Sequence, residues 1–167
     1  MGMSASAYEG TLREIIHAFK YEGRRSLADP LSGMLRDAWS VILDPCDYVV
    51  PVPLHPWRRL TRGFNQAADL AARLGPPVVH ALWRARATAP QTGLRAAARR
   101  RNLRDAISLS PLMRKSALER YVRHRVVLVV DDVRTTGATL EACARVLKAA
   151  GAKEVRTATV ATARAVR

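Results

Sequence analysis

The amino-acid sequence predicts an α/β fold, with a parallel β-sheet and flanking helices in a single domain over residues 1–167. Apolar residues run without a break from Val126 to Val130, which is typical of a central parallel strand buried on both faces. Segments with helical spacing of apolar residues alternate with short apolar runs along the chain, as in βαβ folds. The length of 167 residues, 49% of them hydrophobic, is sufficient for one such core.

Two helices and a short strand are expected in the N-terminal part. The first helix ends near Gly23, and its apolar face consists of Leu12, Ile15, Ile16 and Phe19. The second helix follows Pro30, and its apolar positions are Leu31, Met34, Leu35, Ala38, Trp39 and Ile42. A short β-run extends from Tyr48 to Val52 and is closed by prolines.

A third helix is indicated further along, with Ala67, Leu70, Ala71 and Leu74 on one face and a stop at Gly75 and the two prolines after it. Asn65 stands where its side chain would cap the start of this helix. A strand is expected between Val78 and Trp83. Residues 84–106 are rich in arginine and weakly patterned, which predicts a long mobile loop.

The chain is strongly basic, with a formal net charge of +14. Such a charge favours anionic partners, and it does not choose among a sugar phosphate, a nucleic acid and an acidic protein surface. Cys46 and Cys143 are far apart, with no CxxC motif, so a zinc site is not expected, and Cys143 is interpreted as a core residue. No signal peptide or long apolar segment is evident, which predicts a cytoplasmic protein without membrane contact.

The most informative motif follows the run from Val126 to Val130. Asp131 and Asp132 come directly after it, and Thr135, Thr136, Gly137, Ala138 and Thr139 then lead into a helical pattern. Ligands of open α/β sheets bind at the carboxyl ends of the strands, and a Gly/Thr loop that opens a helix offers backbone N–H groups and hydroxyls to a phosphate. The carboxylates suit sugar hydroxyls or a divalent ion. The motif therefore predicts a ribose 5-phosphate site; the plainer alternative is a buried strand followed by a solvated acidic turn.

A second motif, PVPLHPWRRLTRGFNQ, joins the short β-run to the third helix through a proline-rich turn. Gly63 would allow close approach of the backbone to a ligand, and Arg62 could grip phosphate oxygens with two hydrogen bonds. The alternative is a rigid turn whose arginines, Arg58 and Arg59 included, are simply solvated.

The stretch VLVVDDVRTTGAT resembles the 5-phosphoribosyl 1-diphosphate (PRPP) signature of type I phosphoribosyltransferases. Three further blocks are YEGTLREIIHAFKYEGRRSLADPL, the proline-rich motif, and Gln91 to Leu94 with Arg99 and Asn102. All four blocks resemble, in order and spacing, the ComF family of bacterial phosphoribosyltransferase-like proteins, some of which are associated with DNA-uptake competence. The resemblance covers about residues 8 to 163. Most relatives begin with a four-cysteine zinc ribbon, which is missing here, so a shortened chain and a zinc-free branch stay open as alternatives.

The resemblance implies a phosphoribosyltransferase fold with a small hood, formed by residues 8–43 and 107–124, and it implies site residues. Asp131 and Asp132 would bind the ribose hydroxyls, directly or with Mg²⁺, and would be catalytic together with Arg99. The ribose 5-phosphate would be held by Asp131, Asp132, Val133, Arg134, Thr135, Thr136, Gly137, Ala138 and Thr139. Arg134 could add a cation beside the phosphate or point into solvent. Leu54, His55, Arg62 and Gly63 would form the pyrophosphate loop, and Gln91, Arg99 and Asn102 would belong to a flexible loop that closes over the site.

The implied reaction is transfer of ribose 5-phosphate from PRPP to a nucleobase-like acceptor in nucleoside metabolism, with release of pyrophosphate. Two alternatives stay open: a regulator that binds PRPP or a nucleotide without turnover, and a DNA-uptake accessory protein. The second would bind single-stranded DNA through its basic surface, and only weak binding of that kind is expected here. The oligomeric state is also open, with a homodimer as one alternative.

Overall fold

The computed structural model describes residues 2–39, 46–84 and 106–163. In chain order the elements are β1 (Gly2–Ala7), α1 (Gly10–Tyr21), η1 (Arg25–Leu27), α2 (Ala28–Trp39), β2 (Tyr48–Pro51), α3 (Pro56–Arg62), α4 (Gln66–Ala71), β3 (Leu82–Arg84), β4 (Ile107–Leu109), α6 (Lys115–Tyr121), β5 (Val126–Arg134), α7 (Ala138–Ala149) and β6 (Glu154–Thr162). No helix in these ranges is long and apolar enough to cross a membrane.

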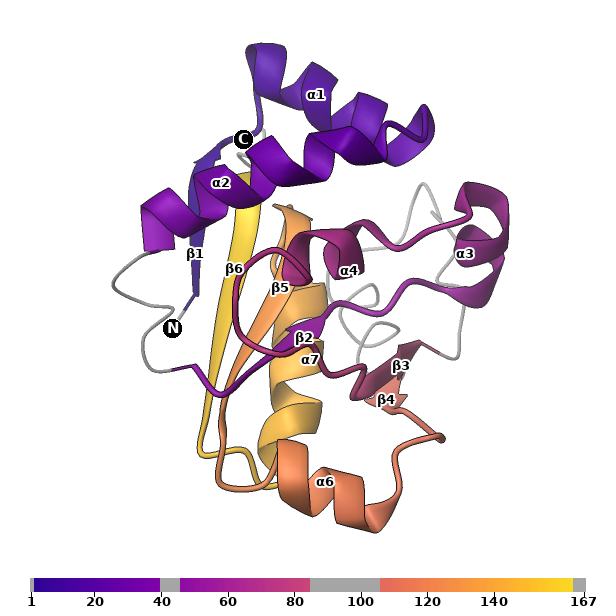
Figure 1. Cartoon of the computed structure of the whole chain (residues 1–167), viewed down its shortest axis with the longest axis vertical. Coiled ribbons are helices and arrows are strands. Elements are labelled where there is room, and N and C mark those ends of the chain that lie inside the picture. The colour runs from indigo at the N-terminus through magenta and orange to yellow at the C-terminus, as the bar shows by residue number, and fades with distance from the viewer. Residues whose placement is uncertain (1, 40–45, 85–105, 164–167) are drawn as a thin grey trace.

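The main sheet has the strand order β1-β6-β5-β2, and every pairing in it is parallel (Figure 1). β5 lies in the interior of the sheet, and Val126 to Val130 are buried, as the unbroken apolar run predicts. Val78 extends the order by a parallel bridge to Val49. The parallel sheet with flanking helices that the sequence predicts is therefore confirmed.

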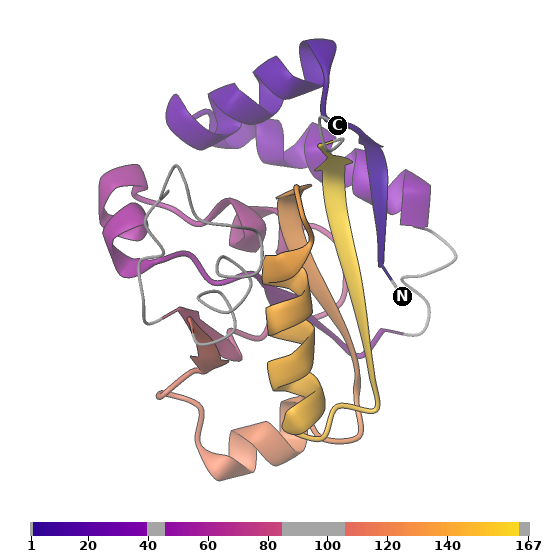
Figure 2. The same ribbon diagram turned by 180° about the vertical axis from the view of Figure 1, so that it is seen from behind.

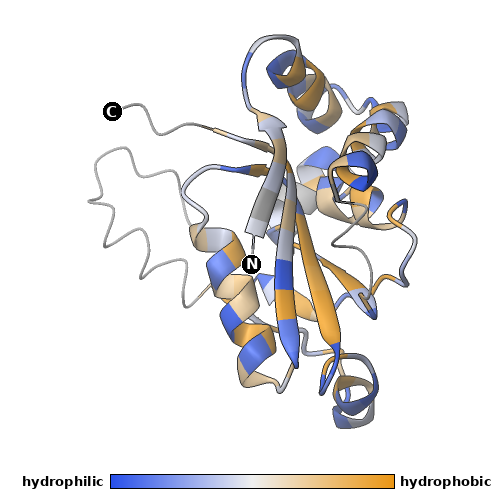
Figure 3. Ribbon diagram, turned by 90° about the vertical axis from the view of Figure 1, so that its left-hand side faces the viewer, coloured by the Kyte–Doolittle hydropathy of each residue, from blue (hydrophilic) through white to orange (hydrophobic). Residues whose placement is uncertain are grey.

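Helices cover both faces of this sheet. On one face, α1, α2 and α4 enclose a core that contains Phe19, Leu35, Leu70 and Leu128. On the other face, α7 packs over β5 and β6 with Cys143 and Leu147, as Figure 2 shows from behind. Figure 3 shows apolar residues concentrated on the central strands between these two layers. Burial raises the pKa of the Cys143 thiol to about 12, so Cys143 stays a neutral core residue, as expected from its place in the helix.

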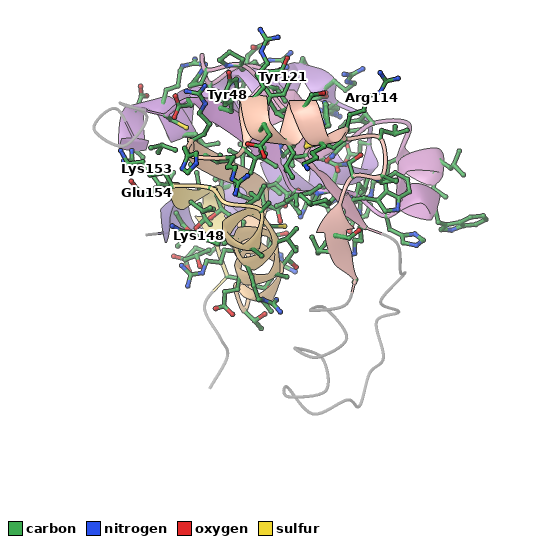
Figure 4. The ribbon with its side chains drawn as sticks, turned by 90° about the horizontal axis from the view of Figure 1, so that it is seen from below. Tyr48, Arg114, Tyr121, Lys148, Lys153 and Glu154 are labelled. Carbon is green, nitrogen blue, oxygen red and sulfur yellow. The ribbon has the colours of Figure 1, made fainter. Side chains whose placement is uncertain are left out.

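Because the strands of the main sheet are parallel, all their carboxyl ends meet at one edge. α1 lies at this edge, where Lys20 reaches Asp132 (Figure 1). α6 lies at the opposite edge, where the ring of Tyr121 meets that of Tyr48 at the start of β2, with centroids 5.4 Å apart (Figure 4). The described parts of the two segments expected to form one hood, 8–43 and 107–124, thus reach opposite ends of the sheet.

Some elements differ from the sequence-based expectation. β1 and β6 were not expected, because their many small and hydroxyl residues hide the strand pattern. The expected strand from Val78 to Trp83 is divided between the bridge at Val78 and β3, which pairs with β4 in a separate antiparallel sheet. The proline-rich turn contains the helix α3. Pro56 is its first residue, a helical position at which proline is well tolerated.

Candidate active site at the carboxyl edge of the sheet

Both acidic residues lie inside β5 rather than after it. The sequence predicts a strand that stops at Val130, but β5 continues to Arg134. The reason is tertiary: β6 supplies hydrogen-bonding partners along this stretch, with Asp131 opposite Thr159 and Arg134 opposite Thr162. The acidic pair therefore sits on rigid backbone at the carboxyl end of an interior strand.

Asp132 lies on the sheet face that α1 covers. The residue is 6% exposed. Its Oδ1 accepts a 2.6 Å hydrogen bond from the backbone N–H of Val133 and lies 3.0 Å from Nζ of Lys20. A buried carboxylate requires such partners, since an unpaired charge would be strongly destabilising there. Lys20 is thus part of the site, brought in from the end of α1.

Asp131 lies on the other face, beside the start of α7. It lines a small pocket with Val133, Arg134, Thr135, Gly137, Ala138, Thr139 and Leu140. Its Oδ1 accepts a 2.9 Å hydrogen bond from the backbone N–H of Asp132. Burial of the carboxyl group, and next the charge of Asp132, raise the pKa of Asp131 to about 7, while Lys20 and Arg84 act in the opposite direction. The two carboxylates thus meet different electrostatic surroundings.

The loop between β5 and α7 has the geometry of an anion site. Gly137 is the N-cap of α7, with a left-handed φ of 78°. Thr135 and Thr136 are exposed, and the N-terminus of this twelve-residue helix adds backbone N–H groups, of which that of Ala138 donates to the Thr136 hydroxyl, and a favourable dipole. The guanidinium of Arg134 lies against the loop, with Nε 3.2 Å from the position that a Cβ on Gly137 would take. Arg134 therefore lies beside the loop, and its role at a phosphate stays a prediction.

The expected pyrophosphate segment is at the same edge. Leu54 and His55 follow β2, and just after this strand the N–H of Val52 donates a 2.9 Å hydrogen bond to the carbonyl of Val130 in β5. Gly63 has a φ of +75° and open space where a Cβ would be. Parallel neighbouring strands therefore bring this segment and the acidic pair to one side of the molecule.

Two details of this segment bear on the prediction. Asn65 does cap α4: its side chain accepts a 3.1 Å hydrogen bond from the N–H of Ala67. The guanidinium of Arg62 lies 4.6 Å from the ring centroid of Tyr21, and its Nη1 is 3.4 Å from Oε1 of Gln66. Arg62 thus contacts the end of α1 in this structure, and its role at a pyrophosphate stays a prediction.

The expected flexible-loop residues Gln91, Arg99 and Asn102 lie outside the described residues, so their roles stay predictions. Lys20 and Arg84 were not expected at the site. Lys20 does belong to the KYEG block that carries part of the family resemblance, but the resemblance assigns no site role to this block. Arg84 begins the arginine-rich segment, where nothing distinguishes it from its neighbours.

The described residues include no group of three or more His, Cys, Asp or Glu side chains that could hold a metal ion by themselves. Mg²⁺, however, keeps several waters and is commonly bound through one or two carboxylates together with substrate phosphates. Asp131 in its pocket beside the phosphate loop fits that arrangement. The donor set is thus compatible with an ion that arrives with a phosphorylated substrate.

Comparison with known proteins shows the family of the chain. Residues 60–167 match the phosphoribosyl transferase domain family. The chain is 33% identical to competence protein F of Haemophilus influenzae over 159 residues, which cover 89% of this chain and 67% of that protein. It is 34% identical to the DNA utilization protein YhgH of Escherichia coli K12 over 165 residues, 92% of this chain and 68% of the relative.

A solved structure shows the same fold. The glutamine phosphoribosylpyrophosphate amidotransferase from B. subtilis superposes with a TM-score of 0.51 at 23% identity, over 81% of this chain and 26% of the amidotransferase. The chain thus spans about two thirds of the two curated relatives and about a quarter of the amidotransferase. On the family match and these relatives, the chain belongs to the phosphoribosyltransferase-domain family and, within it, to the ComF-type proteins.

Proposed function

We propose that this protein is a phosphoribosyltransferase that transfers ribose 5-phosphate from PRPP to a nucleobase-like acceptor and releases pyrophosphate. The observation that carries the proposal is the joint placement of Asp131, Asp132 and the Thr135–Thr139 loop at the carboxyl end of β5. This arrangement offers acceptors for ribose hydroxyls next to donors for a phosphate. Sugar and phosphate could therefore be held as one rigid unit.

In the proposed reaction a nitrogen of the acceptor forms a bond to C1 of the ribose, while the bond from C1 to the pyrophosphate oxygen breaks. Pyrophosphate leaves with the electron pair, and the proton of the acceptor nitrogen passes to the departing pyrophosphate or to water. Positive charge develops on the sugar and negative charge on the leaving group, so positioning and fixed charges supply most of the catalysis. No nucleophilic side chain is required.

The residues of the chain have distinct parts in this scheme. The backbone N–H groups and hydroxyls of the Thr135–Thr139 loop bind the 5′-phosphate, with Arg134 beside them. The two carboxylates hold the ribose hydroxyls on the rigid end of β5. The segment from Leu54 to Gly63 faces the leaving group, and Arg99 acts from the expected flexible loop. Asp131 would hold Mg²⁺ together with the substrate phosphates, and the ion would neutralise part of the pyrophosphate charge.

The direct test is release of pyrophosphate from PRPP and Mg²⁺ by the full chain, measured across a panel of purine and pyrimidine bases. We expect release above the rate without acceptor for at least one base. The control is Asp37→Asn, which removes an exposed carboxylate on α2 and should leave the rate unchanged. Binding of PRPP with no release in the presence of any base would identify a regulator instead of an enzyme.

A second candidate is an accessory role in DNA uptake. It is favoured by two relatives named competence protein F and DNA utilization protein, and by the net charge of +14. These names describe those proteins and do not exclude phosphoribosyl transfer. The salt dependence of nucleic-acid binding, discussed below, separates the two roles.

A further inference from the structure

Lys20 is the last residue but one of α1, and its ammonium is sheltered. Its side chain is 19% exposed, and that of its partner Asp132 is 9% exposed. Ion pairs on an open surface contribute little, because water screens them and two long side chains must be ordered. The pair between Lys20 and Asp132 is largely removed from water. Its geometry is therefore better defined than that of an exposed pair.

The end of α1 is held from a second side. The side-chain amide of Gln66, a residue only 3% exposed, places Nε2 3.4 Å from the carbonyl oxygen of Lys20. The other end of the same amide, Oε1, lies 3.4 Å from Arg62, whose guanidinium covers the ring of Tyr21. Next to Lys20, the ring of the fully buried Phe19 packs on Phe64, with centroids 5.8 Å apart. These contacts fix the backbone position of Lys20.

The contacts of Asp132 in the described structure all fall on one oxygen. Oδ1 receives the N–H of Val133 at 2.6 Å and the ammonium of Lys20 at 3.0 Å. This arrangement orients the carboxylate of Asp132, and within the described residues Oδ2 takes no part in these two contacts. A group held in its working orientation before the ligand arrives costs less to order on binding.

We propose that Lys20 is a positioning residue of the ribose site: it holds Oδ1 of Asp132 so that Oδ2 accepts a ribose hydroxyl. This inference rests on the proposed function and assigns a site role to a residue of α1. Lys20 acts through Asp132 and does not contact the pyrophosphate. Its effect must therefore be the same for ligands with and without that group.

The test is isothermal titration of ribose 5-phosphate and of PRPP, each with Mg²⁺, into the full chain. The variants are Lys20→Met, Lys20→Arg, Asp132→Asn and the double variant Lys20→Met/Asp132→Asn. The matched control is Arg13→Met, which removes one cation from an exposed position of the same helix. Melting curves establish that each variant folds, and Lys20→Gln, which keeps a hydrogen-bond donor, replaces Lys20→Met if the latter fails to fold.

We expect Lys20→Met to weaken both ligands by a similar factor of about tenfold, equivalent to about 1.4 kcal/mol. Lys20→Arg should restore most of the affinity, and Arg13→Met should bind as the wild type does. In the Asp132→Asn background the Lys20 change should have no further effect, because the group that it positions has been altered.

Three results would overturn the inference while the proposed function stands: wild-type affinity of Lys20→Met, loss of PRPP affinity alone, or losses that add in the double variant. Loss of PRPP affinity alone would mean that Lys20 contacts the pyrophosphate. Absence of binding of either ligand to the wild-type chain would instead remove the proposed function, and the inference with it.

Discussion

Asp131 and Asp132 are neighbours in sequence, but they meet different surroundings because successive side chains of a strand point to opposite faces. Asp132 turns toward α1 and is neutralised by Lys20 at 3.0 Å. Asp131 turns toward α7, where burial and the charge of Asp132 raise its pKa to about 7. Asp132 is thus held in an ion pair, while the ionised form of Asp131 is disfavoured by burial and by the neighbouring charge.

This difference predicts a pH-dependent effect of Asp131→Asn on stability. The pKa of Asp131 is higher in the folded state than in the unfolded chain, so its ionisation destabilises the fold progressively between about pH 4 and pH 7. The variant cannot ionise. Its stability relative to wild type should therefore increase by a few kcal/mol between about pH 4 and pH 8. Urea unfolding of both proteins across this range measures the difference, and a difference that does not vary with pH would refute the assignment.

At the scale of elements, the sequence predicts those helices and strands whose formation depends on residues close together in the chain. The run from Val126 to Val130 forms the buried part of β5, and Asn65 caps α4 as its side chain allows. β1 and β6 were missed, because GMSASA and much of EVRTATVAT are too small and polar to show a strand pattern. These two strands are stable because each pairs with a neighbour distant in sequence.

The residues of the candidate site also fall into a group that is contiguous in sequence and a group that only the fold brings together. The candidate phosphate loop, Thr135 to Thr139, is contiguous in sequence, so the sequence alone could suggest it, and its role at a phosphate stays a prediction. Lys20 and Arg84 come from segments far from Asp131 and Asp132, and only the packing of α1 and β3 brings their charges close. The spacing of residues along the chain does not show which distant residues become neighbours in the fold. The faces to which the two carboxylates point depend in turn on the continuation of β5 beyond Val130.

The start of α7 supports a second prediction, on two glycines. Gly137 and Gly63 have similar left-handed φ values, 78° and 75°, so alanine at either position costs about 1–2 kcal/mol in backbone energy. At Gly137 the new Cβ would also lie 3.2 Å from Nε of Arg134, whereas the space at Gly63 is open. Gly137→Ala should therefore destabilise the protein more than Gly63→Ala does.

Denaturant unfolding of the two glycine variants provides this comparison, and Arg134→Ala provides its control. In the Arg134→Ala background the extra cost at Gly137 should disappear, because the crowded side chain is gone. Equal losses for the two glycine variants in the wild-type background would show that Arg134 does not lie against the loop.

At the scale of the whole molecule, the parallel topology determines where the candidate site lies. Because β1, β6, β5 and β2 all run in one direction, the acidic pair, the loop between β5 and α7 and the segment after β2 reach the same edge. The net charge of +14 belongs to the whole chain and serves any anionic partner. The net charge therefore supports only the candidate role in nucleic-acid binding, while the proposed binding of PRPP rests on the geometry at this edge.

These two contributions can be separated by salt. If single-stranded DNA binds through its phosphates, the logarithm of the affinity should fall linearly with the logarithm of the salt concentration. The slope should be about 0.7 per phosphate neutralised. We expect weak binding that is lost as salt approaches physiological concentration. Fluorescence anisotropy with a labelled oligonucleotide measures the slope. Tight binding that persists there and is unaffected by PRPP would favour the DNA-uptake role.

The central claim is that the end of β5 binds the ribose 5-phosphate part of PRPP, and the thermal shift caused by PRPP with Mg²⁺ tests it most directly. A ligand at one hundred times its Kd stabilises the folded state by about 2.7 kcal/mol, which raises the melting temperature measurably. Changing Asp131 and Asp132 together to Asn should abolish this shift while the protein stays folded, and the exposed Asp37→Asn variant on α2 should keep it. A shift of wild-type size in the double variant would contradict the assignment of the acidic pair to the ribose.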